Sequence, residues 1–266
     1  MNFIPDLFVI GAMKGGTSTL WKGAFENEAV SPSQSKEVNF FLEDSPLDKL
    51  ENLYKAQFNK PDQVKIDVSP NYSRRHLFPG VANRIHQANP NAKILYLVRN
   101  PIDRIVSHLH HDMFRDRINK HNFDQRLFQN EDYAKTSSYF FQIEDYLKFF
   151  KKSQILILQM ERMKSDPYGF CAEFASFLNL QDFKLPQKSY NLSEKRYLIK
   201  YHDAFHHYFS FALLGKLYHY FWFMLNIKVD RPQLSSSQVK KFMEMLEPDS
   251  IKLSSEFGID ITNWYK

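Results

Sequence analysis

The chain has 266 residues, of which 43% are hydrophobic and 24% are charged, so it is long enough to bury the core of one large α/β domain. Its formal net charge of +5 suits an anionic small-molecule ligand and is too weak to indicate a nucleic-acid partner. The single cysteine, Cys171, excludes an internal disulfide, and the first residues lack a basic signal segment, so we expect a reducing, cytoplasmic location.

The first predicted element is the apolar strand 7–12, which runs into glycines and a helix start in the sequence FVIGAMKGGTSTLWKG. Such a turn leaves several backbone N–H groups unpaired and pointing one way, which favours phosphate or sulfate. The nucleoside-triphosphate motif places Lys and Ser/Thr directly after its last glycine, whereas here Lys14 precedes Gly15 and Gly16. The pattern therefore predicts an anion site that differs from that of kinases and other NTP-binding enzymes.

Three further apolar runs predict strands at 64–69, 92–99 and 153–160. They lack strict polar/apolar alternation, which is typical of parallel strands covered on both faces. Candidate helices lie between and around them, at 18–27, 78–89, 101–115, 138–151 and 167–178. We therefore predict an α/β three-layer sandwich, with a central parallel sheet flanked by helices and a P-loop-like nucleotide-binding architecture. No linker divides the chain, so we expect a single domain over 1–266, with an irregular polar stretch at 116–136.

The third strand ends in LVRNPIDRIVSHLHHD, where Arg99 stands at its carboxyl end and Asn100-Pro101 can cap and begin a helix. The side chains expected on the solvent-facing side of that helix are Arg104, Ser107, His108 and His111. A guanidinium at a strand end and a hydroxyl on the following helix can clamp one phosphate through charge-assisted hydrogen bonds. Arg99 and Ser107 are therefore candidate anion ligands, although each alone could equally be an ordinary surface residue.

Together these two stretches resemble the sulfotransferases that use 3′-phosphoadenosine 5′-phosphosulfate (PAPS) as sulfuryl donor. KEVNFF at 36–41 is similar to a Lys-Glu-x-x-Phe-Phe stretch of the branch that includes heparan-sulfate and other carbohydrate sulfotransferases. DVSPNY at 67–72 resembles a Ser-Pro-x-Tyr turn, and 137–167 resembles a later helix, strand and acidic loop of the family. The resemblance implies transfer of a sulfuryl group from PAPS to a hydroxyl or amine of a carbohydrate or glycan, with 3′-phosphoadenosine 5′-phosphate (PAP) as product.

The resemblance also implies roles for individual residues. Lys14 would stabilise charge on the bridging oxygen of the donor, whose 5′ side would contact Gly15, Gly16, Thr17, Ser18 and Thr19. The 3′-phosphate would contact Arg99 and Ser107, together with a basic loop whose nearest match, SEKRYLIK, contains Lys195, Arg196 and Tyr197. That last segment has the alternative interpretation of a solvated basic turn. The catalytic base would be Glu37, assisted by Lys36, with a histidine of 108–111 as the alternative.

No metal is expected, because the sulfuryl group carries fewer charges than a phosphoryl group and no predicted strand ends in an Asp that would hold magnesium. The histidines at 108–111 and 202–207 also lack the Cys or carboxylate spacing of a metal site.

The acceptor is the least constrained part of the prediction. The aromatic segment 208–227 is interpreted as a buried helix, or alternatively as a wall for a lipid-like or aromatic acceptor that makes peripheral membrane contact. Sulfation of such a small molecule is thus an alternative to glycan sulfation. A second alternative function is binding of the nucleotide without catalysis. The sequence indicates no particular oligomeric state.

Overall fold

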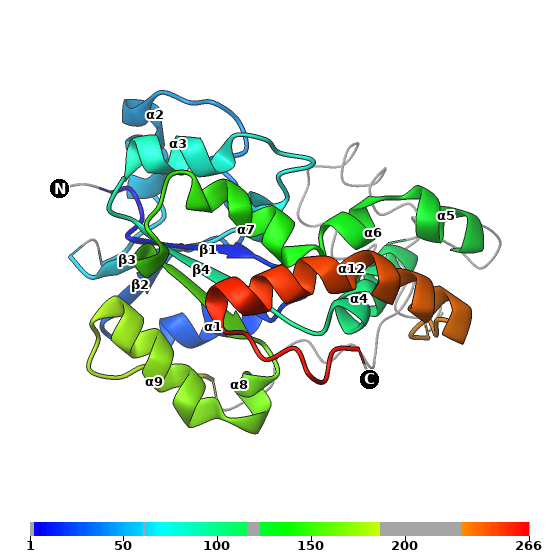
Figure 1. The fold of residues 1–266 in the computed structure, drawn as a ribbon. Helices are drawn as coiled ribbons and strands as arrows, with labels where there is room; N and C mark the ends of the chain where they lie inside the picture. Colours follow the sequence, from blue (N-terminus) through cyan, green and yellow to red (C-terminus); the bar gives the residue numbers. More distant parts are fainter. Residues whose placement is uncertain (1–2, 61, 116–122, 187–229, 266) are drawn as a thin grey trace, which may run out of the picture.

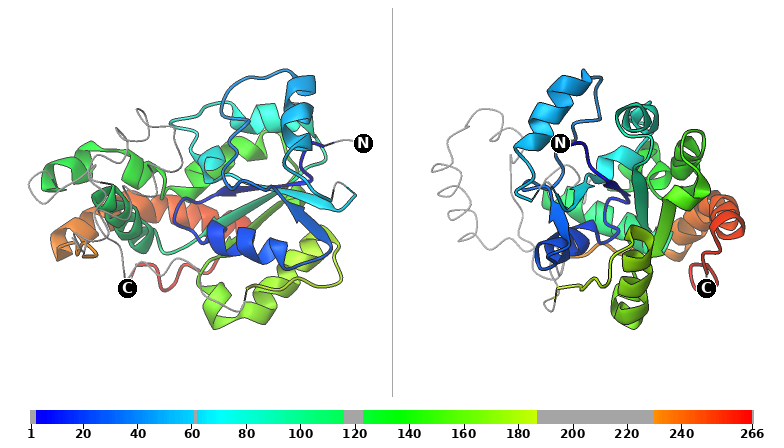
Figure 2. Two further views of the ribbon diagram at one scale, coloured as in Figure 1. Left: turned by 180° about the vertical axis from the view of Figure 1, so that it is seen from behind. Right: turned by 90° about the vertical axis from the view of Figure 1, so that its left-hand side faces the viewer.

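The computed structural model describes residues 3–60, 62–115, 123–186 and 230–265. Within these residues, the centre is a five-stranded sheet whose strands all run parallel, in the order β2-β3-β1-β4-β5. The strands are β1 (Leu7–Gly11), β2 (Val30–Pro32), β3 (Val64–Val68), β4 (Lys93–Val98) and β5 (Ile155–Gln159). Helices cover both faces of this sheet (Figure 1, Figure 2). The predicted α/β three-layer sandwich is confirmed.

Successive side chains of the central strand β1 point to opposite faces of the sheet and join different cores. Leu7 and Val9 pack on one face with α1 (Thr17–Phe25) and α9 (Pro167–Leu178). Phe8 and Ile10 pack on the other face, beneath the helices α2 (Leu47–Lys55), α3 (Val81–Ala88) and α7 (Tyr139–Leu147). Because both faces are covered, β1 is fully buried along its length. This explains why its sequence is a continuous apolar run.

A third apolar cluster lies beside the sheet and joins four helices (Figure 1). They are α4 (Pro101–Phe114), α5 (Phe123–Gln129), α6 (Asp132–Lys135) and α12 (Ser236–Phe257). The buried members are Ile105, Leu109, Leu127, Tyr133, Ala134, Phe242 and Leu246. The expectation that 116–136 is irregular is therefore wrong over 123–129 and 132–135. Tertiary packing of a few apolar side chains stabilises α5 and α6 although the segment is mostly polar.

The remaining short elements follow the ends of strands and helices. They are the 3₁₀ turns η1 (Pro70–Ser73) and η2 (Lys152–Gln154) and the short helix α8 (Arg162–Ser165). Because the strands are parallel, the segments after β1, β3, β4 and β5 meet at one edge of the sheet. Asn100 begins α4 as expected, since its side chain accepts hydrogen bonds from Ile102 N (2.9 Å) and Asp103 N (3.1 Å).

Two predictions concern residues outside the described ones, namely the 3′-phosphate loop with Lys195, Arg196 and Tyr197, and the aromatic segment 208–227. Among the described residues, none of the helices combines the length and the apolar character that crossing a bilayer requires. The boundaries of the domain, 1–266, stay a prediction.

Candidate functional site

The loop after β1 is tightly folded against β4. Ala12 N donates to Leu97 O at 2.6 Å, and Gly15 N donates to Ala12 O at 2.8 Å. A Cβ at Gly15 would lie only 2.7 Å from Leu97 O, so a larger residue does not fit there. Gly16 has φ 93° and is the N-cap of α1, a left-handed conformation that favours glycine. The loop therefore needs its glycines for its shape.

The first turn of α1 is a positive helix end. Its leading N–H groups have no partner within the helix, and it contains no acidic residue. Thr17 is buried, while Ser18 and Thr19 are half-buried at the same end. Lys14 is half-buried just before the helix, with φ 68°. Lys14, Gly16 and three hydroxyl residues thus flank the N-terminus of α1, where an anion can bind.

Arg99 lies at the carboxyl end of β4 and reaches this loop. Its Nη1 donates to Lys14 O at 3.4 Å, and its Nη2 forms an ion pair with Asp103 at 3.3 Å. Its Nε is buried and has no hydrogen-bond partner among the described residues, while the side chain is only 14% exposed. Tyr139 donates to Arg99 O at 2.9 Å and fixes the backbone. The guanidinium thus retains an unsatisfied donor beside the loop, as expected of an anion ligand.

The structure brings Arg99 against the backbone of Lys14, because the two residues follow strands that are adjacent in the sheet. Ser107 is half-buried on α4, six residues after Pro101, which corresponds to roughly 9 Å along the helix axis. It therefore lies farther from the glycine loop than Arg99 does.

Glu37 is held at the carboxyl end of β3, next to β1 in the sheet. Its backbone N donates to Val68 O at 3.0 Å. Its carboxylate pairs with the Lys36 ammonium and is 46% exposed. Because β3 is the direct neighbour of β1, this carboxylate lies at the same edge as the anion loop. A half-exposed carboxylate there is accessible to an acceptor.

The expected solvent-facing side of α4 is wrong for two of its residues. Arg104 is fully buried, and its guanidinium contacts Ser137, His108 Nδ1 at 3.2 Å and Tyr133 O at 2.6 Å. His108 is only 3% exposed and packs edge-on against the Tyr133 ring. Burial, followed by the charge of Arg104, lowers the pKa of His108 well below its usual range. The cause is α6, which packs on the polar side of α4.

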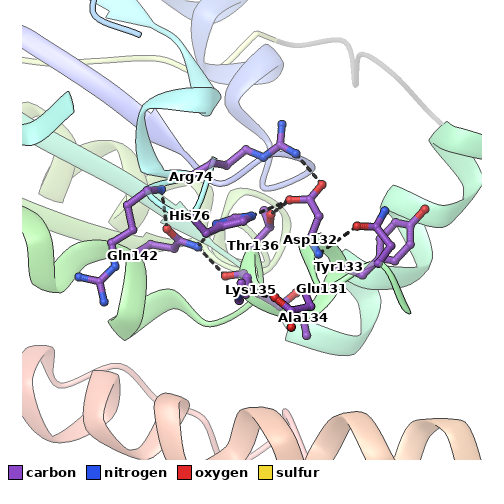
Figure 3. A network of polar contacts seen from close by, with 12 residues as sticks. Arg74, His76, Glu131, Asp132, Tyr133, Ala134, Lys135, Thr136 and Gln142 are labelled. Carbon is purple, nitrogen blue, oxygen red and sulfur yellow. Dashed lines mark hydrogen bonds and ion pairs between the residues drawn. The ribbon is translucent and has the colours of Figure 1, made fainter. Parts of the chain in front are cut away.

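Asp132 is the centre of this buried polar cluster (Figure 3). Arg74 and His76 point toward its carboxylate from the segment after β3, and Thr136 donates to it at 2.8 Å. Burial by itself would raise the pKa of Asp132. The hydrogen bond from His76 and the charges of Arg74 and His108 outweigh burial and hold that pKa well below its usual range. The cluster ties the segment after β3 to α4 and α6.

Sequence reasoning missed a second buried group, which lies behind Glu37. Asp67 in β3 accepts hydrogen bonds from Tyr54, Ser69 and Tyr72. The sequence signal for this group is the segment DVSPNY, which resembles a family turn and contains Asp67, Ser69 and Tyr72.

Among the described residues, no group of three or more His, Cys, Asp or Glu is arranged to hold a metal ion.

Both the family model and the curated relatives that match this chain are sulfotransferases. The family model described as "Sulfotransferase domain" matches residues 4–207. The mouse and human heparan sulfate glucosamine 3-O-sulfotransferase 5 are each 30% identical to this chain over 190 residues, covering 66% of it and 54% of their own length. The chain therefore spans about half the length of these curated relatives.

Solved structures share the fold. A sulfotransferase from Alicyclobacillus acidocaldarius has a TM-score of 0.63 at 20% identity, covering 98% of this chain and 99% of its own. A mouse sulfotransferase complexed with PAP has a TM-score of 0.51 at 18% identity, covering 92% and 83%. At these identities the likeness concerns the arrangement of helices and strands.

Proposed function

Since this chain belongs to the sulfotransferase domain family, whose model matches residues 4–207, we propose that it transfers a sulfuryl group from PAPS to a hydroxyl or amine of a glycan. The names of its curated relatives say that they act on heparan sulfate. The aligned region, in which they are 30% identical to this chain, covers 66% of it. The KEVNFF stretch supports the same acceptor class.

The observation that carries the proposal is the contact between the two anion-binding features. Arg99 Nη1 lies 3.4 Å from Lys14 O, so the residue at the end of β4 touches the glycine loop. PAPS carries anionic groups at two positions of one nucleotide, the 5′-phosphosulfate and the 3′-phosphate. A glycine loop with a helix end suits the first, and a guanidinium with a buried, unpartnered Nε suits the second. A nucleotide that lacks the 3′-phosphate would leave Arg99 with Asp103 as its anionic partner and no phosphate to bind.

In this proposal the residues divide between donor and acceptor. The 5′ side of the donor contacts Lys14 and the loop and helix residues Gly15, Gly16, Thr17, Ser18 and Thr19. The 3′-phosphate contacts Arg99, with Ser107 and the loop residues Lys195, Arg196 and Tyr197 completing its site. The acceptor oxygen or nitrogen forms a bond to sulfur while the bond from sulfur to the bridging oxygen breaks. The electron pair of that bond stays on the departing PAP phosphate, where Lys14 stabilises the charge.

Glu37 is the proposed base that removes the acceptor proton. Its carboxylate is accessible and lies at the end of the strand next to β1, and Lys36 pairs with it. The histidine alternative has less support, because His108 is buried and engaged with Arg104. Metal assistance is not required by the proposal, because the charge on the bridging oxygen is balanced by Lys14.

The test is an acceptor-dependent transfer assay. The protein is incubated with PAPS labelled in the sulfuryl group and with a panel of glycans, N-acetylated and N-sulfated heparosan among them. We expect label on a glycan together with stoichiometric release of PAP. PAP binding without transfer to any acceptor would instead support a non-catalytic binding protein. Label appearing only on lipid-like or aromatic acceptors would overturn the glycan assignment.

A further inference from the structure

The carboxylate of Asp67 is fully buried behind the 36–41 segment and accepts three hydrogen bonds. Ser69 Oγ donates to its Oδ1 at 2.6 Å, while Tyr54 and Tyr72 donate to its Oδ2 at 2.6 and 2.9 Å. Burial raises the pKa of Asp67, and these three hydrogen bonds oppose that rise. A buried carboxylate with three donors is a costly feature for a fold to keep without a purpose.

Two of these hydroxyls also hold the segment that carries Glu37. Asn39 N donates to Ser69 Oγ at 3.2 Å, and Phe41 N donates to the Tyr72 hydroxyl at 3.4 Å. A hydroxyl has one proton, and here each proton is directed at Asp67. The lone pairs of both oxygens are therefore left free to accept from the backbone of the segment. Asp67 sets the direction of both hydrogen-bond relays.

The segment depends on such support because its backbone is strained. Glu37 has φ 62° and Asn39 has φ 58°, a left-handed conformation that is unfavourable for residues with a Cβ. Glu37 N is anchored to Val68 O at 3.0 Å, and Asn71 Nδ2 approaches Asn39 Oδ1 at 3.4 Å. The relays from Asp67 add anchors at the backbone N–H groups of Asn39 and Phe41. Without them the strained turn can relax.

We propose that Asp67 is a positioning residue for the base: through Ser69 and Tyr72 it fixes the 37–41 backbone and thereby aims the Glu37 carboxylate at the acceptor. The inference deepens the proposed function and rests on it, since it assumes that Glu37 removes the acceptor proton. It assigns Asp67 no contact with donor or acceptor.

Asp67→Asn is the decisive substitution because it keeps the size of the side chain and changes only its hydrogen-bonding polarity. The amide NH₂ is a donor, so the hydroxyl that faces it must accept, and that hydroxyl turns its own proton away from residue 67 into another position around its oxygen. One of those positions is the one that the backbone N–H of Asn39 or Phe41 occupies, so the orientation that Asp67 fixes is lost. One relay loses its fixed direction whichever way the amide is oriented.

Tyr54→Phe is the matched control. The Tyr54 hydroxyl donates to the same carboxylate at 2.6 Å, but within the described residues it accepts no hydrogen bond from the backbone of 37–41. The phenylalanine ring would retain the packing of Tyr54 against Phe40 and Phe41. This variant removes one bond of the buried group and leaves both relay hydroxyls, those of Ser69 and Tyr72, in place.

The experiment combines two measurements on the full chain. The first is the turnover number with the glycan acceptor, alongside the PAP dissociation constant from calorimetry. Asp67→Asn is expected to lower turnover by about 10–100-fold with PAP affinity changed less than about twofold. The second is amide hydrogen exchange of the peptide spanning 36–42 in the unliganded protein, which is expected to accelerate by about tenfold. Tyr54→Phe should leave both readouts within about twofold of the parent.

The exchange measurement does not depend on catalysis, so it separates the two proposals. If the parent chain transfers no sulfuryl group but exchange at 36–42 accelerates only in Asp67→Asn, the proposed function fails while the role of Asp67 in holding the segment stands. Unchanged turnover and exchange in Asp67→Asn would overturn the inference, as would equal effects in Tyr54→Phe. If Asp67→Asn does not fold, Ser69→Ala and Tyr72→Phe each remove one relay, and the same criteria apply to them.

Discussion

Arg99 and Arg104 stand five residues apart, Arg99 just after β4 and Arg104 inside α4, yet their surroundings are opposite. Arg99 has two long contacts, to Lys14 O at 3.4 Å and to Asp103 at 3.3 Å, and a buried Nε without a partner among the described residues. Arg104 is fully buried, and its guanidinium contacts Ser137, His108 and Tyr133. One guanidinium retains capacity for a ligand, whereas the other is committed to the protein.

The difference teaches that charge and spacing alone do not identify an anion-binding arginine. Both residues follow the apolar strand β4 closely in the sequence. What separates these two residues is how fully the protein uses their donors. Arg104 has short contacts to fixed carbonyl and side-chain atoms, whereas Arg99 has longer contacts and an Nε without a partner among the described residues. Glu37 follows the same logic, since it is half-exposed and paired only with its neighbour Lys36.

The largest expected effect is on turnover, from Glu37→Gln. The substitution keeps the shape of the side chain and removes its basicity, so turnover should fall by about 10²–10⁴-fold. PAP affinity and stability should be nearly unchanged, because the pair with Lys36 is partly solvated. Steady-state kinetics and calorimetry check this, with the surface substitution Glu43→Gln as control. Normal turnover in Glu37→Gln, with His111→Ala inactive but still binding PAP, would assign the base to a histidine instead.

The substitution Arg104→Met tests the comparison by its effect on stability. Removal of the guanidinium leaves His108 and the carbonyl of Tyr133 without their buried partner, which should lower the free energy of unfolding by about 3–5 kcal/mol. The matched variant Arg99→Met should lose no more than about 1 kcal/mol, since it removes only long contacts. Urea unfolding of the two variants measures both values. Equal losses would contradict the distinction between a committed and an available guanidinium.

Asp132→Asn is expected to have a smaller and pH-dependent effect, of about 2–3 kcal/mol at neutral pH. The pKa of Asp132 is depressed in the folded protein, so its stabilising contribution is present above the unfolded pKa of about 3.9 and is lost as the pH falls below it. The difference in unfolding free energy between parent and variant should therefore shrink below about pH 4. A difference that stays constant or widens on acidification would show that the charged form of Asp132 is not the stabilising one.

The parts of the fold that were predicted correctly are those with a strong local signal. The four long strands are continuous apolar runs because helices cover both sheet faces, and α4 begins at Pro101 because Asn100 caps it. Strand β2 is three residues long and gives no periodic signal, so it was missed. Helices α5 and α6 were missed because their stability comes from packing against α4 and α12.

The candidate site also contains residues that the sequence predicted and residues that it did not. Lys14 and Arg99 were each predicted as anion-binding residues after the ends of apolar strands, and the structure places the Arg99 guanidinium against the carbonyl of Lys14. The burial of Arg104 and His108 could not be predicted, since helical periodicity gives the faces of α4 but not that α6 packs on the polar one. Asp67 escaped notice because a single carboxylate inside a strand has no periodic signature, and its three hydroxyl partners come together only in the fold.

The most direct test of the central claim, that Arg99 and the glycine loop bind one nucleotide with two anionic positions, is a calorimetric titration with PAP and with adenosine 5′-phosphate. The parent chain should bind PAP at least about tenfold more tightly, because each charge-assisted bond to the 3′-phosphate contributes about 1.5–3 kcal/mol. Arg99→Met should lose that preference, and folded Arg104→Met should keep it. Equal affinity of the parent chain for the two nucleotides, or an undiminished preference in Arg99→Met, would contradict the claim.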